Sequence, residues 1–227
     1  MLKHRIIPVL QFDGSQAVKT TKFSRPARPV GSMMQHIMNM ERRDIDEMVI
    51  IDINATRENR RPHYNKLEKW TEVLFCPVTY GGGISDLQDI RAALNAGADK
   101  VIIKTHTKII KEAIQKFGAQ CIVYAVDVND PLGSMIDTDV QPGEIMLTDC
   151  SREGTRTGYG LSYIGWARKY WQCPLVINGG CGMPHHMFQA LRAGADAVAA
   201  SSMFLFMDIT PKHCARYLFE QGVPVRL

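Results

Sequence analysis

The stretch "CPVTYGGGISDLQDIRAALNAGADKV", residues 76–101, returns 97 positions later as "CPLVINGGCGMPHHMFQALRAGADAV", residues 173–198. Eleven of the 26 aligned positions are identical without a gap, including two adjacent glycines and the tetrapeptide AGAD. The same shift places "EMVIID", residues 47–52, over "EIMLTD", residues 144–149. One structural plan therefore occurs twice in this chain.

Each copy reads as a strand, a glycine turn, a helix and a second strand. "CPVTY" is rich in strand-forming residues, "DLQDIRAALNAG" has helical periodicity closed by a glycine, and "KVIIK" is typical of a buried parallel strand. Alternation of strands and helices over 227 residues predicts one domain, residues 1–227, of α/β class: a (β/α)8 TIM barrel of two half-barrel repeats. We expect its eight strands at Arg5–Gln11, Met48–Ile53, Pro77–Tyr80, Val101–Lys104, Cys121–Asp127, Ile145–Thr148, Leu175–Asn178 and Ala197–Ala200.

One connection is shorter than its counterpart in the other half. Gln11 and Glu47 are 36 positions apart, whereas Asp127 and Glu144 are separated by only 17. The shorter segment has Pro and Gly at both ends and room for little more than one helical turn. We therefore expect the fifth helix of the barrel to be shortened or missing.

Composition narrows the class of protein. The hydrophobic fraction of 45% and charged fraction of 22% are ordinary for a soluble globule. A formal net charge of +4 is too small and scattered to indicate nucleic-acid binding, although it suits an anionic small-molecule substrate. The six cysteines lack zinc-like spacing, and no apolar run is long enough for a signal peptide or membrane span. We expect a cytoplasmic protein without a metal or another cofactor.

The duplicated glycines predict two anion sites at the mouth of the barrel. A glycine turn after a barrel strand lets backbone N–H groups approach a phosphate closely. The alternative is that these glycines serve only tight turns and helix packing. The predicted sites comprise Gly82, Gly83, Lys104 and Thr105 in one half and Gly179, Gly180, Ala200 and Ser201 in the other.

Polar residues close several strands at the face where barrel enzymes keep their catalytic groups. Asp127 ends the apolar run "CIVYAV", so a partly desolvated carboxylate there is a candidate acid or base; the alternative is a loop cap. Gln11 ends the first strand, where it can orient or bind a substrate but cannot transfer protons as a carboxylate does. We expect Asp52, Thr148 and Asn178 to complete the substrate-binding surface.

Four charged residues stand at the opposite ends of their strands: Arg5, Glu47, Lys100 and Glu144. Parallel barrel strands all begin on one face, so these side chains should meet at the bottom rim. They would form either a salt-bridge plug that excludes water or a ring that guards a passage.

The chain resembles the imidazole glycerol phosphate synthase cyclase subunit (HisF) family in "RIIPVL", "DEMVIIDINAT", "YGGGI", "EIMLTDCSREGT", "GGCGMPHHM" and "GVPVRL". The resemblance implies docking of a HisH-type glutaminase at the bottom face and passage of ammonia through the barrel to the top. It also implies that the ring of Arg5, Glu47, Lys100 and Glu144 is the ammonia gate.

The likeness to the family's active site is incomplete. One of its two catalytic aspartates matches Asp127, but the other falls on Gln11, and Lys19 matches the family's lysine above the site. Where the family has an Asn-Thr pair, this chain has Lys104 and Thr105. Where the family has an Asp after its sixth strand, this chain has Glu153.

Two loops, "VKTTKFSRPARPVGS" and "IDINATRENRRPHYNKL", look like those of HisF-like paralogues associated with N-acetyl sugar amidotransferases in surface-polysaccharide biosynthesis. This resemblance implies that the barrel supplies ammonia for amidation of such a sugar. The alternatives are a genuine cyclase of histidine biosynthesis, which forms imidazole glycerol phosphate and aminoimidazole carboxamide ribotide, and a non-catalytic activator of the glutaminase.

Overall fold

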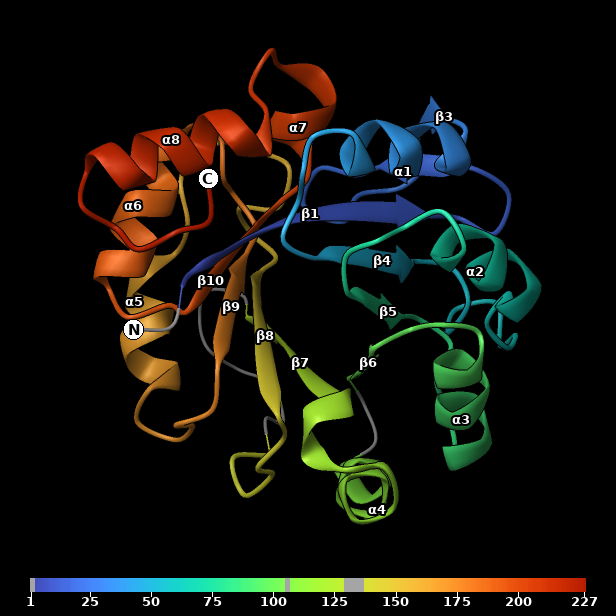
Figure 1. The fold of residues 1–227 in the computed structure, drawn as a ribbon. Helices are drawn as coiled ribbons and strands as arrows, with labels where there is room; N and C mark the ends of the chain where they lie inside the picture. Colours follow the sequence, from blue (N-terminus) through green and yellow to red (C-terminus); the bar gives the residue numbers. More distant parts are fainter. Residues whose placement is uncertain (1–2, 105–106, 129–136) are drawn as a thin grey trace.

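Eight parallel strands close into a barrel in this computed structural model, which describes residues 3–104, 107–128 and 137–227 (Figure 1). The circle closes where Arg5 to Pro8 pair with Ala197 to Ala200. The predicted fold is therefore confirmed, and every predicted strand is found within one or two residues of its expected ends. The barrel strands are β1 (Arg5–Phe12), β4 (Met48–Asp52), β5 (Val78–Gly81), β6 (Lys100–Ile103), β7 (Ile122–Val128), β8 (Glu144–Asp149), β9 (Leu175–Asn178) and β10 (Ala197–Ala200).

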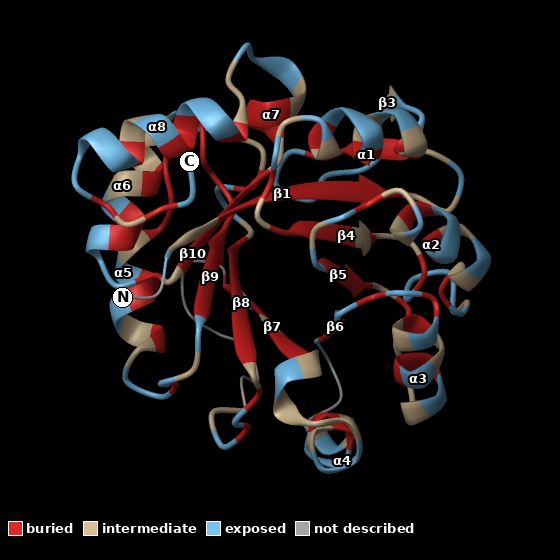
Figure 2. Cartoon of the chain, viewed as in Figure 1, coloured by how far each residue is buried: buried red, intermediate tan, exposed pale blue. Residues whose placement is uncertain are grey.

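Helices surround the barrel and bury one face each, as the colouring by burial in Figure 2 shows. In Leu87–Asn95, for example, Ile90 and Ala93 face the strands, and the side chain of Asp86 caps the first turn by accepting from the Asp89 N–H at 2.8 Å. The helices are α1 (Met33–Glu41), α2 (Tyr64–Thr71), α3 (Leu87–Asn95), α4 (Thr107–Phe117), α5 (Leu161–Ala167), α6 (Pro184–Arg192), α7 (Ser202–Phe206) and α8 (Pro211–Glu220), with a 3-10 turn η1 at Ala119–Cys121.

The sequence repeat is a structural repeat. A shift of 97 residues carries the bounds of β5, α3 and β6 onto those of β9, α6 and β10. The repeated Asp explains part of this: Asp99 accepts from the Val78 N–H at 2.8 Å, and Asp196 accepts from the Leu175 N–H at 2.8 Å. Each carboxylate therefore fastens the start of one strand to the start of the next.

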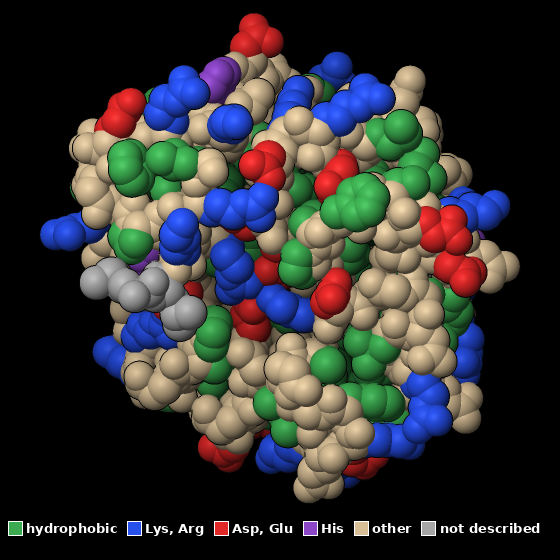
Figure 3. Space-filling model, in the orientation of Figure 1, with side chains coloured by type: hydrophobic (Ala, Val, Ile, Leu, Met, Phe, Trp, Pro, Cys, Tyr) green, Lys and Arg blue, Asp and Glu red, His purple; other side chains and the backbone are tan. Residues whose placement is uncertain are grey.

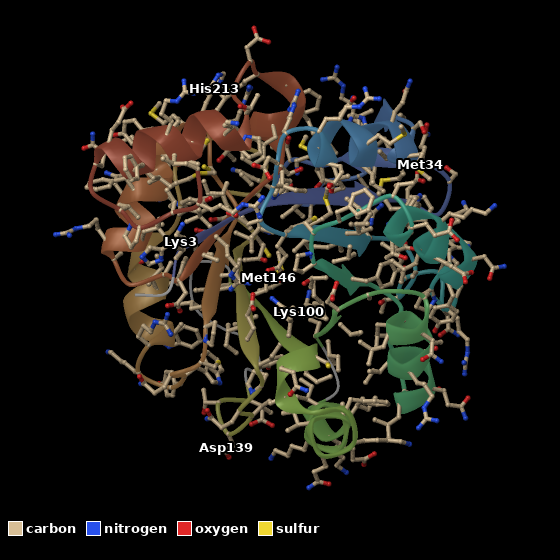
Figure 4. The ribbon with its side chains drawn as sticks, in the orientation of Figure 1. Lys3, Met34, Lys100, Asp139, Met146 and His213 are labelled. Carbon is tan, nitrogen blue, oxygen red and sulfur yellow. The ribbon has the colours of Figure 1, made fainter. Side chains whose placement is uncertain are left out.

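The interior of the barrel is layered because alternate residues of each strand point inward. The middle layer is a separate apolar cluster, and Figure 4 labels one of its members, Met146, near the barrel centre, with Lys100 close by. Both of its members on β10 are alanines, so the layer has the least side-chain bulk along that strand. The cluster consists of Ile7, Val9, Val49, Ile102, Val123, Met146, Val176, Ala197 and Ala199.

An antiparallel hairpin was not predicted. Strands β2 (Ala17–Lys19) and β3 (Arg28–Gly31) extend from the end of β1, where Gln11 pairs with Val18. The predicted loss of the fifth helix falls largely on residues 129–136, which lie outside the described residues; residues 137–143 contain no helix. Within the described ranges, no helix is long and apolar enough to cross a membrane.

Candidate active site

A cavity of about 960 Å³ lies at the carboxyl ends of the barrel strands. Its walls bring together every predicted top-face residue that the structure describes, from both halves of the chain. Thr105 lies outside the described residues. The predicted residues that line the cavity are Gln11, Lys19, Asp52, Gly82, Gly83, Lys104, Asp127, Thr148, Asn178, Gly179, Gly180, Ala200 and Ser201.

Gln11 is buried, with both ends of its amide engaged. Its Oε1 accepts from the Thr20 N–H at 3.0 Å and from the Thr20 hydroxyl at 3.1 Å. Its Nε2 donates to Oε1 of Glu153 at 3.2 Å. Thr20 and Glu153 are also only 3% exposed, so this network is closed to bulk water. Gln11 therefore joins the hairpin β2–β3 to the loop after β8.

Lys19 and Glu153 form a buried ion pair beside Gln11. The other Glu153 oxygen accepts from the Phe23 N–H at 3.2 Å and lies 2.9 Å from the Thr20 hydroxyl, whose single proton is shared between Glu153 and Gln11. Burial lowers the pKa of Lys19 to about 7, whereas the Glu153 carboxylate in contact with it favours the charged ammonium. The pair places a lysine and a carboxylate in the cavity wall at no net charge.

Asp127 lies in a more open part of the cavity, paired with Lys104. The Lys104 Nζ donates to Asp127 Oδ2 at 2.5 Å, and the two side chains are 57% and 25% exposed. Burial acts to lower the pKa of Lys104, but Asp127 outweighs it and raises that pKa above its ordinary value. Desolvation, with a further contribution from Asp127, raises the pKa of the Cys150 thiol to about 12, so Cys150 is a poor nucleophile.

Asp52 lines the cavity with its carboxylate already occupied. The Asn54 and Ala55 N–H groups donate to Oδ1 at 3.2 and 3.0 Å, and Arg60 contacts both oxygens at 2.8 and 2.9 Å. A Cβ on Gly82 would lie 2.1 Å from the Asp52 carbonyl oxygen. The turn thus requires glycine for packing, whether or not an anion binds there.

The second half repeats this arrangement. Asp149 accepts from the Ser151 and Arg152 N–H groups at 3.0 and 3.2 Å, and a Cβ on Gly179 would lie 2.5 Å from the Asp149 carbonyl oxygen. Nearby, Asn178 donates to the Thr148 hydroxyl at 3.3 Å. The buried Ser201 hydroxyl has no hydrogen-bond partner in the described part of the chain.

The predicted ring of charges closes the opposite end of the barrel. Glu47 pairs with Arg5 and accepts from Lys100 at 3.0 Å, while Glu144 pairs with Lys100 at 2.8 Å and Arg5 at 3.3 Å. The Thr79 hydroxyl also donates to Glu47 at 2.7 Å. Figure 3 shows cationic and acidic side chains gathered at the centre of one face.

The ring is largely desolvated yet charged. Burial would raise the pKa of Glu47, but Lys100 and Arg5 more than offset it and hold that pKa below its ordinary value. Burial would likewise lower the pKa of Arg5, but Glu144 and Glu47 raise it. The middle layer of apolar side chains lies between this ring and the cavity.

Several cavity residues were not predicted as site residues. Lys22, Arg25 and Glu153 line the cavity, and Arg60 and Thr20 hold its wall. The "REGT" run after β8 was the signal for Glu153, because it departs from the family's pattern. No periodic signal marks the other four, which lie in loops. Among the described residues, no group of three or more His, Cys, Asp or Glu side chains could hold a metal ion.

Comparison with known proteins agrees with this geometry. Residues 5–210 match the family model described as "Histidine biosynthesis protein". The chain is 35% identical over its full length to the full "Imidazole glycerol phosphate synthase subunit HisF" of Dictyoglomus thermophilum. It is 34% identical, again over the full length of both chains, to proteins of that name from Dictyoglomus turgidum and Clostridium botulinum.

Proposed function

Because the chain belongs to the histidine biosynthesis protein family that includes the HisF subunits of imidazole glycerol phosphate synthase, we propose that it is the ammonia-accepting barrel subunit of a glutamine amidotransferase. A HisH-type glutaminase would dock at the face that carries the charged ring. Ammonia would pass the ring and the apolar layer and react with an anionic substrate in the top cavity.

The observation that carries this proposal is the ring of Arg5, Glu47, Lys100 and Glu144. Apolar side chains alone are enough to exclude water from the end of a barrel. Burying four charged side chains there costs desolvation free energy, and well-packed hydrophobic residues avoid that cost. Ion pairs can separate and re-form, so a ring of them can open for a small polar molecule. The alanines of the middle layer leave the least side-chain bulk beside β10.

The top cavity supports an acceptor with anionic groups. Lys22, Arg25 and Lys104 line it, and glycine turns lie at the ends of β5 and β9 in opposite halves. Of the three carboxylates that line this cavity in the described part of the chain, Asp127 is partly exposed, whereas Asp52 and Glu153 are buried. We assign Asp127 the role of acid or base toward that substrate. An N-acetyl sugar acceptor rests on the two loop resemblances alone.

Gln11 bears on which reaction takes place. Cyclisation to imidazole glycerol phosphate, as the HisF resemblance implies it, uses two carboxylates. Here residue 11 of β1 is an amide, and the carboxylate it contacts, Glu153, is buried in an ion pair with Lys19. Loss of one proton-transfer group typically costs about 10²- to 10⁴-fold in rate. This favours ammonia transfer over cyclisation.

A second candidate function is the cyclase itself. It is favoured by the full-length similarity to HisF subunits and by the presence of Lys19 and Asp127 on the same cavity. In that case the buried Lys19–Glu153 pair would have to open in the substrate complex. A third candidate, activation of the glutaminase without chemistry in the barrel, predicts that Asp127→Asn has no effect on product formation.

Glutamine hydrolysis by a HisH-type glutaminase, measured with and without the full chain, tests the proposed partnership. We expect the barrel to raise the rate of glutamine hydrolysis. We also expect Lys100→Met to change that rate, because this substitution opens one side of the ring. Lys22→Met, a change of the same kind at the top cavity, is the matched control. No complex and no change in hydrolysis would overturn the proposal.

A further inference from the structure

The contact between Lys104 and Asp127 joins a residue predicted to bind an anion to the residue predicted to act as acid or base. Lys104 follows β6 and Asp127 lies near the end of β7, so the two stand on neighbouring strands. Their 2.5 Å contact is the closest that the described residues offer for either side chain. Lys104 therefore neutralises the Asp127 carboxylate.

The strand ladder also places Lys104 beside the glycine turn after β5, on the side away from β7. Gly81 pairs with Ile102 in the β5–β6 ladder, so Gly83 and Lys104 each lie two residues beyond that pair. Gly82, Gly83 and Lys104 all line the cavity. A lysine has a flexible four-carbon stem, and more than half of this one is exposed, so its ammonium group is free to reach either neighbour.

We propose that Lys104 is shared between Asp127 and an anionic group of the substrate, so that binding of the anion releases the Asp127 carboxylate for chemistry. This inference rests on the proposed function and deepens it. Without an anion at the turn, Lys104 neutralises Asp127. When a phosphate-like group occupies the turn at Gly82 and Gly83, Lys104 turns toward it and Asp127 becomes a free carboxylate.

This arrangement makes Lys104 a specificity-determining residue. A substrate without an anionic end leaves Asp127 paired with the lysine and therefore less able to accept a proton. The raised pKa of Lys104 agrees with a lysine that stays charged in both positions. Cys150, which also lies beside Asp127, keeps its proton and does not compete for the lysine.

A double-mutant cycle with inorganic phosphate tests the sharing. Calorimetric titration of the full chain gives the phosphate dissociation constant, and Lys104→Met identifies the binding event that involves Lys104. We expect Lys104→Met to weaken that event about tenfold and Asp127→Asn to strengthen it about threefold, the size typical of a partly exposed ion pair. The combination Lys104→Met with Asp127→Asn should bind phosphate as weakly as Lys104→Met alone.

The control replaces a different cavity cation. Lys22→Met removes one positive charge from the same cavity, and the gain from Asp127→Asn should persist in that background. An equal gain from Asp127→Asn with and without Lys104 would mean that Asp127 only repels phosphate through space, and this would overturn the sharing. So would the absence of any gain. If the wild-type chain binds no phosphate at all, the anionic substrate class of the proposed function falls as well.

Discussion

Gln11, one residue before the end of β1, is an amide in a place where a second negative charge would be costly. Its Nε2 already donates to Glu153, whose carboxylate lies in the same buried network as Lys19. Two carboxylates in contact cannot both ionise without raising one pKa. The identities of residues 11 and 153 are thus physically linked: an amide at one position suits the carboxylate at the other.

Replacement of Gln11 by Asp should therefore destabilise the protein. The change removes the hydrogen bond to Glu153 and places like charges together, for a loss of about 1–3 kcal/mol in the free energy of unfolding. Urea denaturation measures this change in the free energy of unfolding. The double variant Gln11→Asp with Glu153→Gln keeps one carboxylate in the buried network of Lys19 and should recover most of the loss. Equal stability of the single variant and the wild type would contradict this account of the network.

The position of Asp52 at the end of a strand was predicted from the sequence, but the hydrogen-bond partners of its carboxylate were not. Its place at the end of a strand follows from the sequence, but its partner Arg60 lies eight residues on in an irregular loop. No period or motif marks that pairing, so sequence reasoning could place Asp52 on the cavity without showing that its oxygens are occupied.

Removal of Arg60 should show how far the buried Asp52 carboxylate depends on its cation. The Asp52 side chain is fully buried, so Arg60→Met leaves a buried carboxylate without its cation and should cost roughly 2–3 kcal/mol, reduced from the fully buried case because Arg60 is partly exposed. Thermal denaturation measures the change. Arg57→Met, which removes an exposed cation of the same loop, is the control and should stay within about 0.5 kcal/mol of wild type.

At the scale of elements, the loop after β8 helps to fasten the hairpin β2–β3 to the barrel. The Lys22 N–H donates to the Glu153 carbonyl at 2.7 Å, and the Glu153 side chain holds Lys19, Thr20 and Phe23. The hairpin escaped sequence analysis because its strands have three and four residues, too few to establish a period of two. Its position carries Lys22 and Arg25 to the mouth of the cavity.

Loss of the Glu153 charge should loosen this hairpin. Glu153→Gln keeps the shape but leaves Lys19 without its ion pair, so we expect faster tryptic cleavage after Lys22 in the native protein. Glu58→Gln, which removes an exposed carboxylate bonded to Arg60, is the control. The same cleavage rate in Glu153→Gln and wild type would show that the hairpin does not depend on this side chain.

At the scale of the whole molecule, the repeat made the barrel predictable. Eleven identities fixed two half-barrels, and the remaining strands followed from alternating apolar runs. The bottom ring was predictable for the same reason, because parallel strands bring their first residues to one rim. The pairings within the ring depend on side-chain geometry across the barrel, which a sequence does not contain.

The ring should make stability depend on pH. The pKa of Glu47 is lower in the folded protein than its ordinary value of 4.5. Its stabilising contribution is therefore complete above about pH 4.5 and is lost as the pH falls through the folded-state pKa. The difference in unfolding free energy between wild type and Glu47→Gln, measured by urea denaturation at several pH values, should shrink below pH 4.5. A difference independent of pH would contradict a charged Glu47.

We propose that this HisF-type barrel transfers ammonia at a top site that lacks the two carboxylates of cyclisation. The most direct test is turnover of the bisphosphorylated cyclase substrate by the full chain at saturating ammonium salt, beside the HisF subunit of Dictyoglomus thermophilum under the same conditions. We predict no imidazole glycerol phosphate from the folded wild-type chain. Formation of that product at a rate similar to the Dictyoglomus subunit, lost in Asp127→Asn, would contradict the claim and identify a cyclase that works with Gln11.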